Sequence, residues 1–251
     1  MQMRRAIRDF LLASPAAPMV EWVYLHFYPC KNARYDRQAL KVMRRALHPD
    51  SNWVDVGAHR GSVTRSLLGF APNGKCFAFE PIPEIFQALQ KKYPQITVLP
   101  FALSDQEGEV SFQHVVSNPG YSGLKKRQYP ADDFVINEIT VATQRLDNII
   151  PEDIEIDFIK IDVEGAEMGV LKGSVNTIRS GKPVIIFEHG LGGADYYGTR
   201  PDDVYDFLHD ECGLELSLMV RWIKGMPQFS RQEFIDRFRT GADYYYIAYP
   251  G

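Results

Sequence analysis

The amino-acid sequence predicts an α/β protein built on a mostly parallel, doubly wound sheet. Short apolar runs alternate with segments of helical periodicity along most of the 251 residues, which is the pattern of strand–helix–strand units. A glycine turn follows the first run, as in folds that hold a nucleoside beyond the strand ends. Hydrophobic residues form 45% and charged residues 24% of the chain, so a full core can form without disulfides or metal.

The first 48 residues are expected to form an N-terminal helical arm, and residues 49–251 the Rossmann-like domain. Within the arm, Leu40, Met43 and Leu47 recur at helical spacing, and Pro49 ends the helix. The amphipathic start of the arm favours packing against the domain or a partner subunit over lying on a membrane surface. The arm is therefore compatible with a homodimer.

The first half of the domain alternates strands with helices. Val63, Leu67 and Leu68 place a helix after Gly61, and prolines bracket the next helix. The predicted strands are 53–56, 75–80 and 96–103, and the proline-bracketed helix is 81–94.

The second half begins irregularly and then returns to the same alternation. A long polar loop, 116–133, separates two strands, and a glycine-rich loop, 190–203, precedes a helix. Long loops in compact domains tend to be functional, and Tyr121, Ser122, Tyr196 and Tyr197 are candidates for lining an acceptor pocket. For any single one of the tyrosines, packing of the loop onto the core is the favoured alternative. The predicted strands are 108–115, 138–143, 156–162, 182–190, 214–220 and 243–250, and the predicted helices are 163–179 and 204–212.

Composition excludes several classes of function. The formal net charge of −4 argues against a nucleic-acid-binding surface. Cys30, Cys76 and Cys212 lie far apart without metal-ligand spacing, which favours a reducing, cytoplasmic setting. No apolar run has the length of a transmembrane segment.

The turn after the first strand reads "DVGAHRG", which departs from the dinucleotide fingerprint. In that fingerprint a middle glycine allows the backbone to approach a pyrophosphate, and here His59 occupies the position. The remaining pair, Gly57 and Gly61, favours a nucleoside without phosphates, such as S-adenosylmethionine. Glu80 ends the second strand, where an acid is placed to bind ribose hydroxyls. A tight turn with close helix packing is the competing explanation for the glycines, and both can hold.

The sequence resembles a known family at this point. The stretches "VDVGAHRGSVT", "FEPIPEIF", "FALSDQEGEVSF" and "IKIDVEGAEMGVLKG" are similar to successive motifs of the FkbM-type S-adenosylmethionine-dependent methyltransferases. The resemblance implies a seven-stranded Rossmann-like methyltransferase fold and O-methylation of a hydroxyl on a sugar, glycolipid or natural product. It also implies a donor site to which these residues contribute: Asp55, Gly57, Ala58, Gly61, Glu80, Ala102, Leu103 and Ser104.

Three residues at the far strand ends are candidates for catalysis. Asp162 ends a strand and is expected to touch the donor or the acceptor, although a helix cap explains it equally well. Glu164 precedes the turn and is expected to face the cleft. His189 ends a later strand and is a candidate base, since imidazole titrates near pH ~6.5; a hydrogen-bonded loop histidine is the equal alternative. All three are expected in one cleft beside the transferred methyl group. The set is too loose for a hard-cation site, and no metal is predicted.

Acidic strand ends suit a cationic donor and oppose phosphates. Sulfonium chemistry requires mainly alignment of the acceptor oxygen, methyl and sulfur, with a base for the acceptor proton. The leading hypothesis is therefore an S-adenosylmethionine-dependent O-methyltransferase. A methyltransferase-like scaffold that binds without catalysis is one alternative, since fold alone does not settle function. A nicotinamide-dependent oxidoreductase is the other, disfavoured by the missing glycine.

Overall fold

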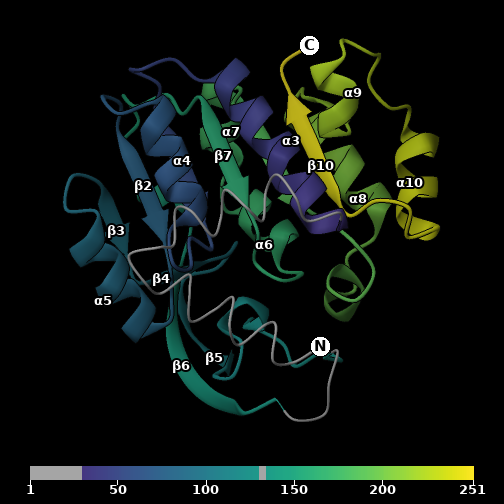
Figure 1. The fold of residues 1–251 in the computed structure, drawn as a ribbon. Helices are drawn as coiled ribbons and strands as arrows, with labels where there is room; N and C mark the ends of the chain where they lie inside the picture. Colours follow the sequence, from purple (N-terminus) through teal and green to yellow (C-terminus); the bar gives the residue numbers. More distant parts are fainter. Residues whose placement is uncertain (1–29, 130–133) are drawn as a thin grey trace.

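The structure is a computed structural model that describes residues 30–129 and 134–251, so the first part of the expected helical arm lies outside the described residues. Its centre is a seven-stranded sheet in the order β3-β2-β1-β7-β8-β10-β9 (Figure 1). The pairs from β3 to β8 are all parallel, whereas β10 runs antiparallel to both β8 and β9. This confirms the predicted seven-stranded, mostly parallel fold. The strands are β1 (Trp53–Val56), β2 (Cys76–Phe79), β3 (Thr97–Leu99), β7 (Phe158–Ile161), β8 (Val184–Glu188), β9 (Glu215–Ser217) and β10 (Tyr245–Tyr249).

Helices cover both faces of this sheet because the strand residues alternate between two cores. Trp53 and Phe158 pack with the helices of one face, whereas Val54 and Ile159 pack with those of the other. On the first face lie α3 (Lys31–Ala46), α4 (Ser62–Phe70) and α9 (Met219–Ile223), and α5 (Pro83–Lys92) packs beside β2 and β3; on the second lie α6 (Glu167–Lys172), α7 (Val175–Gly181), α8 (Pro201–Asp206) and α10 (Arg231–Arg239).

A smaller sheet in the order β4-β6-β5 extends beyond the carboxyl ends of the central strands (Figure 1). It consists of β4 (Phe101–Leu103), β5 (Gly108–Val115) and β6 (Ile136–Gln144). The predicted single strand over 96–103 is therefore wrong: it divides at Pro100 into β3 of the large sheet and β4 of the small one. Proline has no N–H to continue a strand ladder, and the chain changes partner there, from β2 to β6.

The carboxyl-terminal third differs most from the sequence prediction. The predicted strand 214–220 is shorter, because the chain enters α9 two residues after β9 ends at Ser217. No helix was predicted between 221 and 242, yet α10 occupies Arg231–Arg239. Its start is a capping box in which Ser230 and Glu233 bind each other's backbone N–H groups. That spacing was readable in the sequence.

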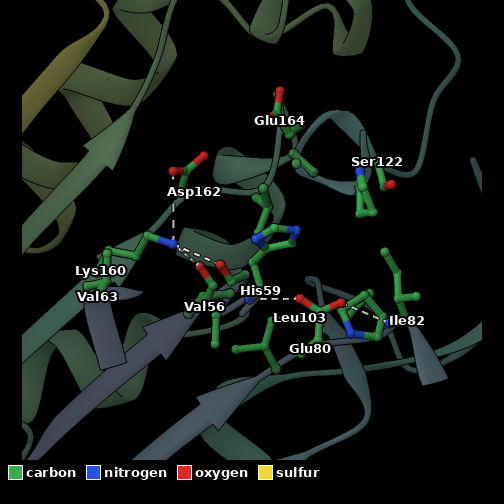
Figure 2. A pocket seen from close by; sticks show the side chains of 18 of the residues that line it. Val56, His59, Val63, Glu80, Ile82, Leu103, Ser122, Lys160, Asp162 and Glu164 are labelled. Atoms are coloured by element: carbon green, nitrogen blue, oxygen red, sulfur yellow. Dashed lines mark hydrogen bonds and ion pairs between the residues drawn. The ribbon is translucent and has the colours of Figure 1, made fainter. Parts of the chain in front are cut away.

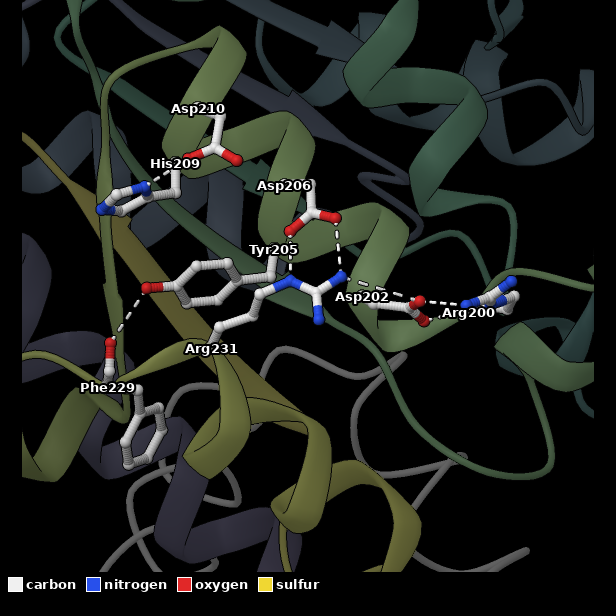
Figure 3. Close-up of polar contacts among 8 residues, drawn as sticks. All are labelled: Arg200, Asp202, Tyr205, Asp206, His209, Asp210, Phe229 and Arg231. Carbon is white, nitrogen blue, oxygen red and sulfur yellow. Dashed lines mark hydrogen bonds and ion pairs between the residues drawn. The ribbon is translucent and has the colours of Figure 1, made fainter.

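Charged side chains join α8 to α10 on the surface (Figure 3). The Arg231 guanidinium donates to both carboxylate oxygens of Asp206, at 2.6 and 2.8 Å. Asp202 lies 3.7 Å from the same guanidinium and also pairs with Arg200. Beneath them the Tyr205 hydroxyl donates to the Phe229 carbonyl oxygen at 3.2 Å. These contacts fix α10 against the sheet face that α8 covers.

No helix in the described ranges combines the length and the apolar character that crossing a bilayer would require.

Candidate functional site: a pocket at the strand ends

The turn from β1 to α4 closes one end of a pocket. Gly57, His59 and Gly61 all have left-handed φ angles, of 73°, 50° and 76°. The N–H groups of Gly57 and Ala58 both donate to the Phe79 carbonyl oxygen, which ties the turn to the end of β2. A Cβ atom on Gly57 would lie 2.1 Å from the Asp162 carbonyl oxygen. Only glycine therefore permits the ends of β1 and β7 to approach this closely.

The pocket follows the carboxyl ends of the central strands, as the Rossmann-like topology predicts. Figure 2 shows its side chains: Glu80 lies at one end, near Ile82 and Leu103, and Asp162 and Glu164 lie at the other. Of the predicted donor residues, Gly57, Ala58, Glu80, Ala102, Leu103 and Asp162 line it, whereas Asp55, Gly61 and Ser104 do not.

Glu80 is fixed before any ligand binds. Its Oε2 accepts from the His59 N–H and its Oε1 from the Ile82 N–H, both at 2.9 Å (Figure 2). Only 4% of the residue is exposed, and this burial raises its pKa to about 7 against the opposing effect of the two hydrogen bonds. Each carboxylate oxygen keeps a second lone pair, so the group can still accept from hydroxyls in the pocket.

Asp55 does not line the pocket but contacts residues that support its wall. It is fully buried, accepts from the Thr64 hydroxyl at 2.6 Å, and lies 3.4 Å from the Lys160 ammonium. Lys160 in turn donates to the carbonyl oxygens of Val56 and Gly57. Burial alone would lower the pKa of Lys160, but the charges of Asp55 and Asp162 outweigh it and raise that pKa. The lysine thus stays charged and braces the end of β1.

Three carboxyl groups meet at the other end of the pocket. Asp162, Glu164 and Glu188 have oxygen atoms within 4.8 Å of one another. Burial and the charge of Asp162 hold the pKa of Glu188 well above its usual range, and the two groups share a hydrogen bond. Hard cations prefer such oxygens, but Arg127 already pairs with Glu164, and Lys160 lies 3.9 Å from Asp162. The chain's own positive charges and a bound proton therefore balance the cluster.

His189 lies outside this cleft, so the expectation that it joins Asp162 and Glu164 is wrong. It is 1% exposed, and its ring stacks on Phe238 and Phe234, with centroids 4.5 and 6.0 Å apart. Burial lowers its pKa to about 4. Because neighbouring residues at a strand end face opposite ways, Glu188 faces Asp162 and His189 faces α10. The sequence analysis lacked α10, so this apolar partner was missing from it.

The remaining predicted residues are structural in their contacts. Ser104 donates from its hydroxyl to Asp105 and from its N–H to the Gln144 carbonyl oxygen. A Cβ atom at Gly61 would lie 2.6 Å from Leu89 of α5 and from Tyr93, the residue that follows α5, so close packing explains that glycine. The contacts of Gly61 thus support a tight turn with close helix packing, the alternative explanation for this glycine.

The two loops beside the pocket are joined to each other. The Lys125 N–H donates to the Tyr197 hydroxyl and the Gln128 N–H to the Tyr196 hydroxyl, both at 3.0 Å. Ser122 lines the pocket, while Tyr121, Tyr196 and Tyr197 do not. Of these candidates for an acceptor pocket, Tyr196 and Tyr197 instead hold the two loops together.

Asp36 and Tyr245 are among the residues of the pocket wall that were not predicted from the sequence. Tyr245 was assigned to a core strand, but its hydroxyl donates to Asp162 at 2.8 Å. Asp36 is the single acid on α3, a helix that carries six basic residues. That single negative charge on a basic helix was the signal by which Asp36 could have been found in the sequence.

Comparisons with known proteins agree with this architecture. The sequence model described as "Methyltransferase FkbM domain" matches residues 55–216. The chain is 27% identical to the 2-O-methyltransferase NoeI of Sinorhizobium fredii, over 71% of this chain and 78% of that protein. It is 26% identical to the hexuronic acid methyltransferase AglP of Haloferax volcanii, over 72% and 70%.

A solved structure gives the same fold. The crystal structure of methyltransferase FkbM from Methylobacillus flagellatus superimposes with a TM-score of 0.51 at 20% identity. The match covers 81% of this chain and 44% of that longer chain. At this identity the likeness concerns the fold alone.

Proposed function

The chain belongs to the FkbM methyltransferase family, and from this premise we propose that it transfers a methyl group from S-adenosylmethionine to a hydroxyl oxygen of a sugar, glycolipid or natural product. The observation that carries the proposal is Glu80, fixed at the end of β2 with free lone pairs facing the pocket. Of the two relatives, the 2-O-methyltransferase NoeI supports oxygen as the accepting atom, and the hexuronic acid methyltransferase AglP supports a saccharide as the acceptor class.

The pocket fits a cationic nucleoside without phosphates. Glu80 is placed to accept hydrogen bonds from ribose hydroxyls, and Ile82, Ala102 and Leu103 give an apolar surface suited to a purine ring. Asp162 adds negative charge farther along the sheet, where it would attract a sulfonium and repel a pyrophosphate. These residue types favour S-adenosylmethionine over a dinucleotide.

In the proposed reaction the protein contributes mainly alignment and electrostatics. S-adenosylmethionine, when bound, supplies a methyl group already activated on a positively charged sulfur. Glu80 fixes one end of the donor, and Asp162, itself fixed by the Tyr245 hydroxyl and by Lys160, supplies negative charge at the other. Holding the reactants in a reactive alignment can lower a barrier by several kcal/mol, up to about 7–11 in favourable cases.

Calorimetry and product analysis test the proposal together. We expect S-adenosylmethionine and S-adenosylhomocysteine to bind, and NAD to bind weakly or not at all. The methyl glycosides of a neutral hexose and of a hexuronic acid then serve as acceptor probes, read by mass spectrometry as a gain of one methyl group. Tight NAD binding without a response to the methyl donor would overturn the proposal. Donor binding without transfer to a wider panel of hydroxyl compounds would favour the non-catalytic scaffold.

A further inference from the structure

We propose that Asp36, on α3, is the group that accepts the proton of the acceptor hydroxyl. The inference rests on the proposed function and deepens it by assigning the base. Asp36 lines the pocket together with Asp162 and Tyr245. It reaches the pocket from α3, which precedes the region that the family model matches.

Asp36 lies at the end of the pocket where a donor held at Glu80 would direct its sulfonium. Glu80 follows β2, and Asp162 follows β7, two strands farther along the sheet. Neighbouring strands are ~4.8 Å apart, so this step along the strand ends is about 10 Å. Asp36 interacts electrostatically with Asp162 and Lys160 rather than with Glu80. It is therefore placed beside the reacting end and away from the ribose end.

The other carboxyl groups of the pocket are already engaged. Glu164 is paired with Arg127. Asp162 accepts from the Tyr245 hydroxyl and shares a hydrogen bond with Glu188, whose pKa is held well above its usual range by burial and by the charge of Asp162. These oxygen atoms are therefore already held by partners within the protein, whereas a base for the acceptor needs a free lone pair directed into the pocket.

Asp36 differs from these groups in its contacts. Its side chain is exposed to the pocket, and no side chain or backbone group in the described ranges hydrogen-bonds to it. The protein walls partly desolvate it nonetheless, and together with the charge of Asp162 they raise its pKa to about 6. It is thus ionised at neutral pH yet basic enough to take a proton. The charged or titratable groups that face it come from α3, β7 and β10. They are Arg37 on its own helix, Lys160 in β7, Asp162 directly after β7, and Tyr244 and Tyr245 at the start of β10.

The proposed step balances without a further reagent. The acceptor oxygen forms its bond to the methyl carbon as the carbon–sulfur bond breaks, and that electron pair stays on the sulfur. The hydroxyl proton passes to the Asp36 carboxylate and from there to water through the pocket mouth. The products are the methyl ether and S-adenosylhomocysteine.

Donor affinity tests the position of Asp36 without any acceptor. S-adenosylmethionine carries the sulfonium charge and S-adenosylhomocysteine does not, so the ratio of their dissociation constants reports negative charge near the sulfur. We expect Asp36→Asn to weaken S-adenosylmethionine relative to S-adenosylhomocysteine by roughly fivefold at pH 7.5, the scale of one charge pair at close range in water. In the wild type the preference for S-adenosylmethionine should fall as the pH drops through about 6, and in Asp36→Asn this change should be absent.

A matched control removes one negative charge at the amino ends of the strands, away from the pocket at their carboxyl ends. Asp153 is exposed in the turn before β7, so Asp153→Asn should leave the affinity ratio unchanged. If Asp36→Asn gives the wild-type ratio at every pH, Asp36 is not beside the sulfur and the inference is overturned. If the wild type binds neither compound, the proposed function itself fails, which is a different result.

The rate of methyl transfer to the responding glycoside probe then tests the chemistry. Base catalysis contributes ~10²–10⁴ in rate, so kcat should fall at least 10²-fold in Asp36→Asn, with the S-adenosylhomocysteine affinity kept. The acidic limb of the wild-type pH profile, at or below about pH 6, should vanish with it, and Asp36→Glu should recover part of the rate. An Asp36→Asn variant with wild-type kcat would exclude this role while leaving the proposed function intact.

Discussion

Glu80 illustrates how a single side chain can be prepared for a ligand by backbone contacts. Its two carboxylate oxygens accept hydrogen bonds from the N–H groups of His59, in the turn after β1, and of Ile82, just after β2. The same contacts make Glu80 part of the fold, because its removal would leave the buried N–H of Ile82 and the partly buried N–H of His59 without this acceptor. A truncation to alanine would therefore mix a loss of stability with a loss of binding.

Glu80→Gln separates the two effects better. The amide keeps the size and one acceptor but loses the charge, and charge-assisted hydrogen bonds contribute ~1.5–3 kcal/mol each. We expect the dissociation constant of S-adenosylmethionine to rise at least tenfold in calorimetry, while the melting temperature shows whether the fold is kept. Glu84→Gln, an exposed acid on α5, is the matched control and should bind normally. Unchanged binding in Glu80→Gln would mean that Glu80 only braces the turn.

His189 makes a second residue-scale prediction, which concerns stability. Its pKa of about 4 lies below the unfolded value near 6.5, so between these values the unfolded chain binds a proton that the folded chain does not. Its contribution is complete above pH ~6.5 and is lost as the pH falls, by roughly 3 kcal/mol in total. In His189→Phe this loss should disappear, so the difference in unfolding free energy from wild type should change between pH 7 and 4 in urea titrations. A constant difference would show that His189 titrates normally.

At the scale of elements, the two loops at the pocket form a joined wall. Tyrosine hydroxyls of the Ala194–Tyr197 turn accept from backbone N–H groups of the loop that contains Lys125 and Gln128. Arg127 adds a bond to the Gly192 carbonyl oxygen and the ion pair with Glu164. The wall therefore connects the smaller sheet to the strand ends that carry the acids.

Removing both hydroxyls, in the double variant Tyr196→Phe and Tyr197→Phe, should loosen this wall. Each lost hydrogen bond contributes ~1 kcal/mol, so local opening should become at least tenfold more frequent. Lys125, Lys126 and Arg127 offer trypsin sites there, and their cleavage in the native protein should accelerate by about that factor. Tyr121→Phe is the control, because its hydroxyl makes no hydrogen bond within the described part of the chain. Equal cleavage rates for the wild type, the double variant and Tyr121→Phe would show that these two hydroxyls do not hold the loops together.

For the whole molecule, several buried acids give the donor-free protein a characteristic response to pH. Burial raises the pKa of Glu80 and of Glu167 to about 7, and that of Glu188 well above its usual range. In the unfolded chain these groups ionise near pH ~4.5. The folded state therefore binds more protons above that pH, and its stability falls as the pH rises through the folded pKa values.

Between pH 6.5 and 8 this fall should exceed the opposing contribution of His189, because the folded His189 is neutral there and the unfolded one is at most half protonated. Each group with a pKa of about 7 should cost roughly 1 kcal/mol of unfolding free energy over this interval, measured by urea titration. Glu167 accepts from the N–H groups of Val163 and Gly165. The variant Glu167→Gln should therefore reduce the pH-dependent loss of unfolding free energy by the contribution of this one group. A stability that rises with pH across this range would contradict the assignment of these groups as protonated.

The sequence alone determined the fold class and the placement of Glu80 at one end of the pocket. The alternation of apolar strands and helices, the turn at Gly57 and the acid at Glu80 are local signals, since each depends on a strand and the few residues that follow it. The capping box at Ser230 and Glu233 was equally local and could have revealed α10. Pro100 likewise carried the information that one strand becomes two.

Only the tertiary structure decided which residues form the other end of the pocket, where Asp162 and Glu188 lie. Which side of β8 faces the pocket depends on the helices that cover each face, and so Glu188 enters the acid cluster while His189 packs on α10. Asp36 comes close to Asp162 across more than a hundred residues of chain, through the packing of α3 on the sheet. Such contacts arise from the burial of apolar faces far apart in sequence, and the charged residues that accompany those faces are brought together as a consequence.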